Sequence, residues 1–533
     1  MSATTASLTG AGTLLRVALR HEGPLLAPWV LAVTLLSASS VVAYPWVFPD
    51  AAARHALAVA VEANPALGLV FGRADDLTTA DGFNAWQTLP LGGFFVALGA
   101  VLAVTRVTRG QEDSGQAELL ASGVMGRPAR LLTGVAVALL GSCAAGVVAG
   151  VVTALCGGTW GTSLLIGATY AGTGWMLAAV AAVAAQVGSD ARTANALAVG
   201  TLGTLFLARG VCVALDAPAW TLWVNPLGWM LETLPAAGNH WAPLLLAVAL
   251  TVAVVALGFV LQSGRDYGQG FVAPRAGPAR GRVRGPLLLA VRLDRGPVLT
   301  WAIAFHLLGL VLGYLTTSVP DLVAADAGVR LVLASGAATP EQLTAAFVRT
   351  LLNLVGVVAA VPGVQMLLRV RAEERAGRVG PLLAGALPRT RYYASHVAVA
   401  LTAVTGYLVG AGFVVALMAA RADLPVGFLD VLEQTVATAP AVWVVVAVAV
   451  ALVGARPVAG GATWGVLVAT FLLTLLGPTF GLDERVLGVS PFRHVPRTMS
   501  AAPDWSGVGW LTLVAAGLVA VGLLGFRRRD LAR

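Results

Sequence analysis

The sequence predicts an all-α polytopic membrane protein with twelve transmembrane helices in two pseudo-symmetric six-helix halves. Of its 533 residues, 58% are hydrophobic and only 11% are charged, whereas about 25% of the residues of a soluble domain are charged. Twelve apolar stretches are long enough to cross a bilayer, and several charged motifs of the first half recur in the second. Together these observations exclude a soluble protein.

Each predicted span contains about 20 mostly apolar residues, the length that crosses a hydrocarbon core about 30 Å thick. The spans of the first half are 25–46, 86–105, 131–155, 160–187, 194–215 and 242–262. Those of the second half are 298–318, 347–368, 393–418, 432–454, 458–480 and 507–526. Glycine and proline occur inside several of them, which membrane helices tolerate.

The distribution of charge predicts which ends of the spans face the cytoplasm. With the N-terminus in the cytoplasm, 25 of the 34 arginines but only 10 of the 26 acidic residues lie in cytoplasmic segments. Basic loops stay on the cytoplasmic side of a membrane, so both termini are expected there. The net charge of +8 then reflects topology, and no nucleic-acid partner is expected because the arginines lie in short loops beside membrane helices.

All 34 basic residues are arginines, because lysine is absent from the chain. A P-loop nucleotide site requires a lysine that contacts the β- and γ-phosphates, so no such site is expected here. The three cysteines lie in or beside apolar spans and are interpreted as small buried hydrophobes without a metal site. If ATP drives this protein, a separate chain must bind it.

Charged motifs near the ends of the spans recur in the same order in the second half. Five positions after the second span recur after the eighth with a shift of 262 residues: Arg109, Glu112, Gly115, Leu120 and Arg127 become Arg371, Glu374, Gly377, Leu382 and Arg389. The other repeats pair Gly23-Pro24 with Gly296-Pro297, Asn225-Pro226-Leu227 with Ser490-Pro491-Phe492, and Arg265-Asp266 with Arg529-Asp530. Their shifts are 273, 265 and 264 residues, so the sequence indicates a duplication.

The repeats divide the chain into a first six-span half (1–262), a cytoplasmic linker (263–287) and a second six-span half (288–533). Glycine, proline and arginine dominate the linker, which shows no apolar periodicity. Because six is an even number, both halves enter the membrane in the same sense and are expected to be related by a pseudo-two-fold axis along the membrane normal.

The two loops that follow the second and eighth spans each combine charges, a Leu-Leu-Ala patch and a final arginine. This pattern suits a short helix at the cytoplasmic interface, although an ordinary positive-inside loop would also explain the arginines. The acidic residues favour docking to a partner protein, since orientation alone does not require them. The candidate docking residues are Arg109, Glu112, Asp113, Glu118, Arg127, Arg371, Glu373, Glu374 and Arg389.

Both loops contain Arg-x-x-Glu-x-x-Gly followed by Leu-Leu-Ala and a final arginine, and this arrangement resembles the coupling helix of type-2 ABC-transporter permeases. The double-length chain is similar to the single-chain permeases described as exporters of polyketide antibiotics in actinobacteria, and Pro226 to Trp229, Arg265-Asp266 and Phe526 to Asp530 fit that group. The second half departs from the pattern at Gly380-Pro381, where the first half has Glu118-Leu119.

The resemblance implies a permease of the bacterial inner membrane that exports hydrophobic compounds such as antibiotics, drugs or lipophilic metabolites. The chain itself would be neither an enzyme nor a cofactor-binding protein. Two copies of a separate ABC ATPase, carrying ATP and Mg²⁺, would dock under the two coupling loops.

In the resembling family the pathway lies between the second and fifth spans of each half. Candidate pathway residues are Phe94, Phe95, Phe206, Asn353, Trp464 and Phe471. For any one of the aromatic residues, the sequence favours lipid contact or helix packing over a role in the pathway.

Two other functions are alternatives to ABC export. A proton-driven secondary exporter of the major facilitator type also has twelve spans in two parallel halves. It generally needs a carboxylate inside the membrane, and no acidic residue lies near the middle of a predicted span. A membrane-embedded enzyme would need a clustered catalytic set or an H-E-x-x-H motif, and the sequence contains neither.

Overall fold

The computed structural model describes residues 10–62, 65–121, 126–265, 269–272, 285–317, 339–475, 483–500 and 502–530. These residues form helices, turns and irregular segments and contain no strand. Twelve of the helices in these ranges are long and apolar enough to span a membrane, so the predicted all-α polytopic fold is confirmed. The cytoplasmic location of the termini stays a prediction.

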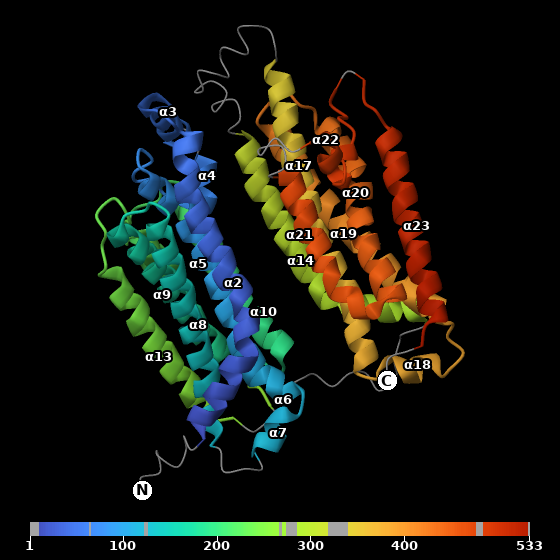
Figure 1. Cartoon of the computed structure of the whole chain (residues 1–533), viewed down its shortest axis with the longest axis horizontal. Coiled ribbons are helices and arrows are strands. Elements are labelled where there is room, and N and C mark those ends of the chain that lie inside the picture. The colour runs from blue at the N-terminus through green and yellow to red at the C-terminus, as the bar shows by residue number, and fades with distance from the viewer. Residues whose placement is uncertain are drawn as a thin grey trace. The chain divides into compact units, whose positions relative to one another are not determined.

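The chain forms two compact units, Met1–Gly277 and Pro278–Arg533 (Figure 1). The spanning helices of unit 1 are α2 (Ala11–Val47), α5 (Ala80–Thr105), α8 (Arg127–Leu155), α9 (Trp160–Val187), α10 (Ala191–Ala214) and α13 (Pro243–Ser263). Its shorter elements are α3 (Ala51–Glu62), α4 (Pro65–Phe71), the π-helix η1 (Arg106–Gly110), α6 (Gln111–Asp113), α7 (Gln116–Ala121), α11 (Trp220–Val224) and α12 (Pro226–Leu231).

The spanning helices of unit 2 are α14 (Pro286–Thr317), α17 (Pro340–Arg375), α19 (Arg389–Arg421), α20 (Phe428–Ala455), α21 (Ala462–Leu475) and α23 (Ser506–Arg528). Its shorter elements are α18 (Val379–Leu383), η2 (Pro457–Gly461), α22 (Glu484–Leu487) and η3 (Pro491–His494). We call the end of each unit that carries α6 and α7, or α18, its charged end; α3 and α22 lie at the opposite ends (Figure 1).

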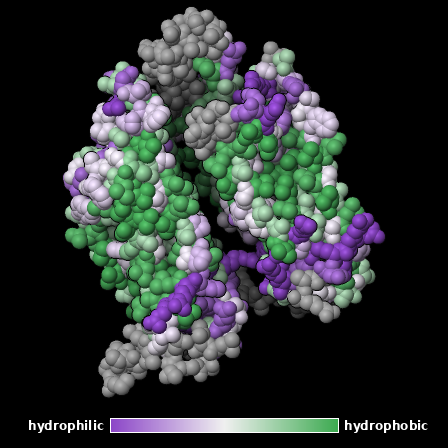
Figure 2. All heavy atoms as spheres, in the orientation of Figure 1, coloured by the Kyte–Doolittle hydropathy of each residue, from purple (hydrophilic) through white to green (hydrophobic). Residues whose placement is uncertain are grey.

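The second and fourth spans form the centre of each unit. Within their most apolar windows, 72% of α5 and 78% of α9 is buried, as is 67% of α17 and 72% of α20. The sixth spans, α13 and α23, are only 17% buried and expose leucine, valine and tryptophan side chains. Such apolar side chains cover the middle of each unit (Figure 2), where lipid rather than water can contact them.

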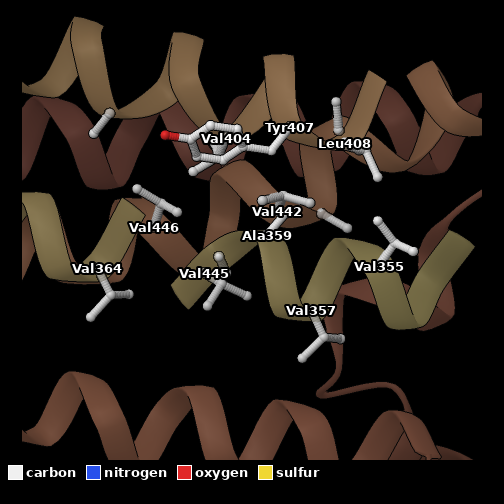
Figure 3. Packing of buried hydrophobic residues seen from close by; sticks show 14 of the residues in the cluster. Val355, Val357, Ala359, Val364, Val404, Tyr407, Leu408, Val442, Val445 and Val446 are labelled. Carbon is white, nitrogen blue, oxygen red and sulfur yellow. The ribbon is translucent and has the colours of Figure 1, made fainter. Parts of the chain in front are cut away.

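Small β-branched side chains and alanines build the core of unit 2. Val355 and Ala359 of α17 pack with Val404 of α19 and with Val442 and Val446 of α20 (Figure 3). Small residues at these positions let the helix backbones approach closely, which is how membrane helices gain packing energy.

The two units pack the second span on the fourth at equivalent positions. Two glycines of the second spans show how closely these helices approach. A Cβ atom added to Gly93 would lie 3.3 Å from Thr173 Oγ1, and one added to Gly356 would lie 3.0 Å from Thr438 Cγ2. Gly356 follows Gly93 by 263 residues, and Thr438 follows Thr173 by 265. These contacts define how the spans of one unit correspond to those of the other.

The repeated Glu-x-x-Gly motif forms the turn that ends the charged segment of the second span. Gly115 has φ = 75° and Gly377 has φ = 71°, a left-handed conformation that glycine adopts without steric cost. The Gly115 N–H donates to the carbonyl oxygen of Glu112 at 3.1 Å, and the Gly377 N–H donates to that of Glu374 at 3.0 Å. The duplication is therefore visible in backbone geometry as well as in sequence.

Just before this turn, unit 1 has one residue more than unit 2. Arg106 and Arg109 are three residues apart, whereas Arg369 and Arg371 are two apart. Unit 1 accommodates its extra residue in η1, a single wide π turn that continues α5, while α17 runs on as an α-helix to Arg375. A π turn contains one residue more than an α turn, because its hydrogen bonds join residues five apart instead of four.

We expect Gly115→Ala and Gly377→Ala each to destabilise the protein by about 1 kcal/mol, because a Cβ atom disfavours positive φ. No atom lies within 4 Å of either added Cβ, so backbone strain alone should cause the loss. Thermal unfolding of the purified chain in lipid nanodiscs measures it. Gly380→Ala, at a helical glycine with equally open surroundings, is the matched control and should not lower the midpoint.

Candidate functional site

The carboxylate of Glu112 lies buried at the charged end of unit 1 among three arginines. Its oxygens lie 2.8 Å from Arg109 Nη1, 3.3 Å from Arg130 Nη2 and 2.8 Å from Arg265 Nη2. All four side chains are at most 9% exposed. Charges buried to this extent are stable only when paired and hydrogen-bonded.

The same arginines bind the ends of further helices. Arg109 donates through Nε to the carbonyl oxygen of Ala185, near the end of α9, and through Nη2 to that of Gln269 at 3.1 Å. Arg265, which follows α13, donates to Gln186 Oε1 at 2.7 Å. The cluster therefore joins spans two, three, four and six of unit 1. It also holds residues 269–272 of the predicted linker, where Phe271 N–H donates to the Gln186 carbonyl oxygen.

Unit 2 repeats the central pair of this cluster. Glu374 is 3% exposed and accepts from Arg529 Nη1 at 2.5 Å and Nη2 at 2.6 Å. Arg529 also donates from Nε to the carbonyl oxygen of Gly454 at the end of α20, and Arg389 Nη1 donates to the Arg529 carbonyl oxygen. Arg529 follows α23 as Arg265 follows α13, so in both units the residue after the sixth span holds the acid at the end of the second.

A second ion pair ties the first span to the second in each unit. Arg106 Nη2 lies 2.7 Å from Glu22 Oε2, and Arg369 Nη1 lies 3.0 Å from Asp294 Oδ1. Both acids are nearly buried. The pairs occupy matching places although Glu22 immediately precedes the repeated Gly-Pro and Asp294 precedes it by two residues.

The fifth span of unit 1 is attached through its N-terminus. Asp113 Oδ2 accepts from the N–H of Ala191 at 2.8 Å, and Asp190 caps the same helix by accepting from the Thr193 N–H. Burial raises the pKa of Asp190, but hydrogen bonds from Thr193 and Ser189 outweigh it, so the pKa lies below its usual value. The carboxylate therefore stays charged at neutral pH, where it is favoured by the helix dipole.

These positions correct one expectation from the sequence. Arg109, Glu112, Arg371 and Glu374 were expected on short interfacial helices, but they lie in the last turns of the continuous spanning segments Ala80–Asp113 and Glu341–Arg375. The short helices α7 and α18 begin only after the glycine turns. Since Glu112 and Glu374 point into their own units, neither carboxylate presents a free charge to a partner.

The other candidate docking residues are more accessible. Asp113 and Glu118 are exposed, and Glu373 pairs with the exposed Arg378 at 3.1 Å. Arg371 is partly buried beside Gly460, and the side chain of Arg127 lies outside the described residues. The sequence therefore did not distinguish the buried charges of these two segments from the exposed ones.

The candidate pathway residues lie in both units. In unit 1, the rings of Phe94 (α5) and Phe206 (α10) meet edge to face at a centroid distance of 5.3 Å. Phe95 is 38% exposed and lies beside Trp29. Phe94 of span two and Phe206 of span five are therefore in direct contact, in a packed arrangement.

In unit 2, Asn353 (α17) and Phe471 (α21) line a cavity of about 590 Å³. We call it the basic cavity, because Arg349, Arg493 and Arg497 also line it. Trp464 lies on α21 and is 39% exposed, but it is not among the lining residues.

Several of these residues were not singled out from the sequence as site residues. In the sequence, Arg265 and Arg529 stand out through their repeat, with a shift of 264, and through the resemblance to the permease family, but neither signal assigns them to a buried cluster. Arg106 and Arg369 are likewise repeated, with a shift of 263. The three arginines of the basic cavity have no arginine at the equivalent positions of the first half, so no repeat could reveal them.

Residues 13–261 and 283–527 match the family described as multidrug efflux system permease Rv1217c, C-terminal domain. The chain belongs to this family. It is also 37% identical to the multidrug efflux system permease protein Rv1217c of Mycobacterium tuberculosis, over 98% of this chain and 95% of the relative. This permease is thus the membrane subunit of an ABC-type exporter and a multi-pass protein of the bacterial inner membrane, and the major facilitator alternative is not favoured.

We expect Glu374→Gln to destabilise this permease by about 3–5 kcal/mol, because it leaves Arg529 buried without its counter-charge. Glu373→Gln, which breaks a pair with an exposed arginine, should cost no more than about 1 kcal/mol. Denaturant unfolding in mixed micelles measures both. The loss in Glu374→Gln/Arg529→Gln should be smaller than the sum of the single losses; additive losses would contradict a direct interaction.

Proposed function

We propose that this permease exports hydrophobic compounds with energy from two copies of a separate ABC ATPase. The ATPases would dock at the two charged ends, against α7 in unit 1 and α18 in unit 2. ATP and Mg²⁺ would be bound by the ATPases, with no cofactor on this chain. The absence of lysine supports this division of labour, because a P-loop cannot be built without it.

The observation that carries the proposal is the way the charged end of unit 1 joins its spans. Glu112 and its arginines connect spans two, three, four and six, Glu22 adds the first span and Asp113 adds the fifth. The segment with α6 and α7 continues directly from this network. A force applied to α7 would therefore reach all six spans through short, charge-assisted contacts.

In this proposal the buried acids position the docking segments, and exposed residues of α7 and α18 contact the ATPases. Glu118 on α7 and Leu382 on α18 are exposed. The two docking segments differ, since Gly380 stands in α18 where α7 has the acidic Glu118. We therefore expect unequal contributions from the two ATPase contacts.

Glu118→Arg should lower ATPase co-purification and substrate-stimulated ATP hydrolysis by about tenfold, which corresponds to a loss of about 1.4 kcal/mol of binding free energy. Because the side chain is exposed, thermal stability should not change. Co-expression with the candidate ATPase subunit, followed by affinity purification, measures the effect. Glu62→Arg reverses an exposed acid on α3, at the opposite end of unit 1, and should leave both quantities intact. Normal binding in Glu118→Arg would exclude α7 as a docking element.

Export should continue when a protonophore collapses the proton gradient while ATP is maintained, since the driving force is ATP hydrolysis. The measurement is efflux of a fluorescent hydrophobic dye from cells that express this permease with its ATPase. Depletion of ATP with the gradient intact should stop efflux. The reverse pattern would support a secondary transporter instead.

A further inference from the structure

The two units differ at the ends opposite their charged ends. The basic cavity of unit 2 has a volume of about 590 Å³, whereas the corresponding region of unit 1 contains a cavity of about 20 Å³. The correspondence follows from the repeat, because Trp86 and Leu222 line the small cavity while their equivalents Arg349 and Leu487 line the large one.

Smaller side chains account for part of the extra space. Phe94 of unit 1 corresponds to Val357 of unit 2, and Arg209 corresponds to Thr474. In unit 1, Phe94 packs against Phe206, and Arg209 lies 4.5 Å above the Phe206 ring. In unit 2, Val357, Thr474 and Phe471 (the equivalent of Phe206) instead line open space.

The charge of the cavity also differs between the units. Arg349, Arg493 and Arg497 stand where unit 1 has Trp86, Gly228 and Glu232. No acidic residue is among the described residues that line the basic cavity. Arg493 pairs with Glu484, which is exposed. Arg349 and Arg497 make no ion pair with any described residue, and the charged neighbours of Arg349 are the other two arginines.

The remaining lining supplies polar groups and an apolar wall. Asn353 Oδ1 is buried without a hydrogen-bond partner among the described residues, and the hydroxyls of Thr474 and Ser490 lie 2.7 Å apart. Leu354, Val357 and Phe471 form apolar surface. A cavity that combines unpaired arginines with such a wall suits a ligand with one acidic end and one apolar end.

We propose that the basic cavity binds amphipathic organic anions. The acidic group pairs with Arg349 and Arg497, and the apolar body lies against Val357 and Phe471. The volume lies within the range of roughly 300–1,000 Å³ that is usual for small-molecule sites. Arg349 precedes Glu374 by 25 residues of the same helix, or about 37 Å at 1.5 Å per residue, so the site lies across the membrane from the charged end.

That the basic cavity binds export substrates rests on the proposed function, whereas binding of organic anions in the cavity does not. The test therefore uses the full chain alone, in nanodiscs of zwitterionic lipid, without ATPase or ATP. The probes are 1-anilinonaphthalene-8-sulfonate and N-phenyl-1-naphthylamine, which share an apolar ring system but differ by the anionic sulfonate. Fluorescence titration, corrected for empty nanodiscs, gives the affinity of each.

We expect saturable binding of the sulfonate, weakened at least tenfold by Arg349→Gln and by Arg497→Gln. Binding of the neutral amine should change less than twofold in the same variants. Arg485→Gln is the matched control, because it removes a nearby exposed charge on α22 that does not line the cavity; it should leave both affinities unchanged.

Three results would overturn the proposal. The first is absence of saturable sulfonate binding, which would also follow if another part of the chain filled the cavity. The second is an equal loss of both probes in Arg349→Gln, which would indicate a structural role for this arginine. The third is an effect of Arg485→Gln as large as that of Arg349→Gln, which would indicate unspecific attraction. None of these results would affect ATPase docking or ATP-driven export of neutral compounds.

Discussion

The fold of each half depends on a buried carboxylate at the end of its second span. A charge removed from water is costly unless an opposite charge and hydrogen bonds replace the lost solvation. Glu112 and Glu374 meet this requirement with an arginine that follows the sixth span, Arg265 or Arg529. The contact closes each half, since it joins helices that are more than 150 residues apart in sequence. Arginine suits this role because it binds a carboxylate through two parallel N–H groups and keeps its charge.

The two copies have kept one end alike and have diverged at the other. Both retain the buried pair, the glycine turn and the ion pair between the first and second spans. At the opposite ends, unit 1 is packed with aromatic side chains, whereas unit 2 has a large cavity with arginines. Under the proposed function, the ends that are alike would each contact an ATPase, whereas the ends that differ would contact the exported compound differently in the two halves.

Much of this architecture could be predicted from the sequence. Apolar length located the twelve spans, and the repeats located both charged ends. The direction of the Glu112 and Glu374 side chains could not be predicted, because it depends on contacts with Arg265 and Arg529 that lie far away in the chain. The basic cavity could not be predicted either. Recognising it requires the alignment of Phe94 with Val357 across the two halves, and the sequence does not give this alignment because the repeat shifts vary from 262 to 273 along the chain.

The wide turn η1 explains how unit 1 accommodates the change of repeat shift from 263 at Arg106 to 262 at Arg109. Each residue added to an α-helix rotates everything after it by about 100°, which would carry an inward-facing side chain toward lipid or water. Arg106 and Glu112 must both face the interior of unit 1 to meet their partners. By taking up the extra residue in a single π turn, the helix keeps these two side chains in phase. The wide turn therefore keeps Arg106 and Glu112 directed toward their partners, although this copy has one residue more than its counterpart.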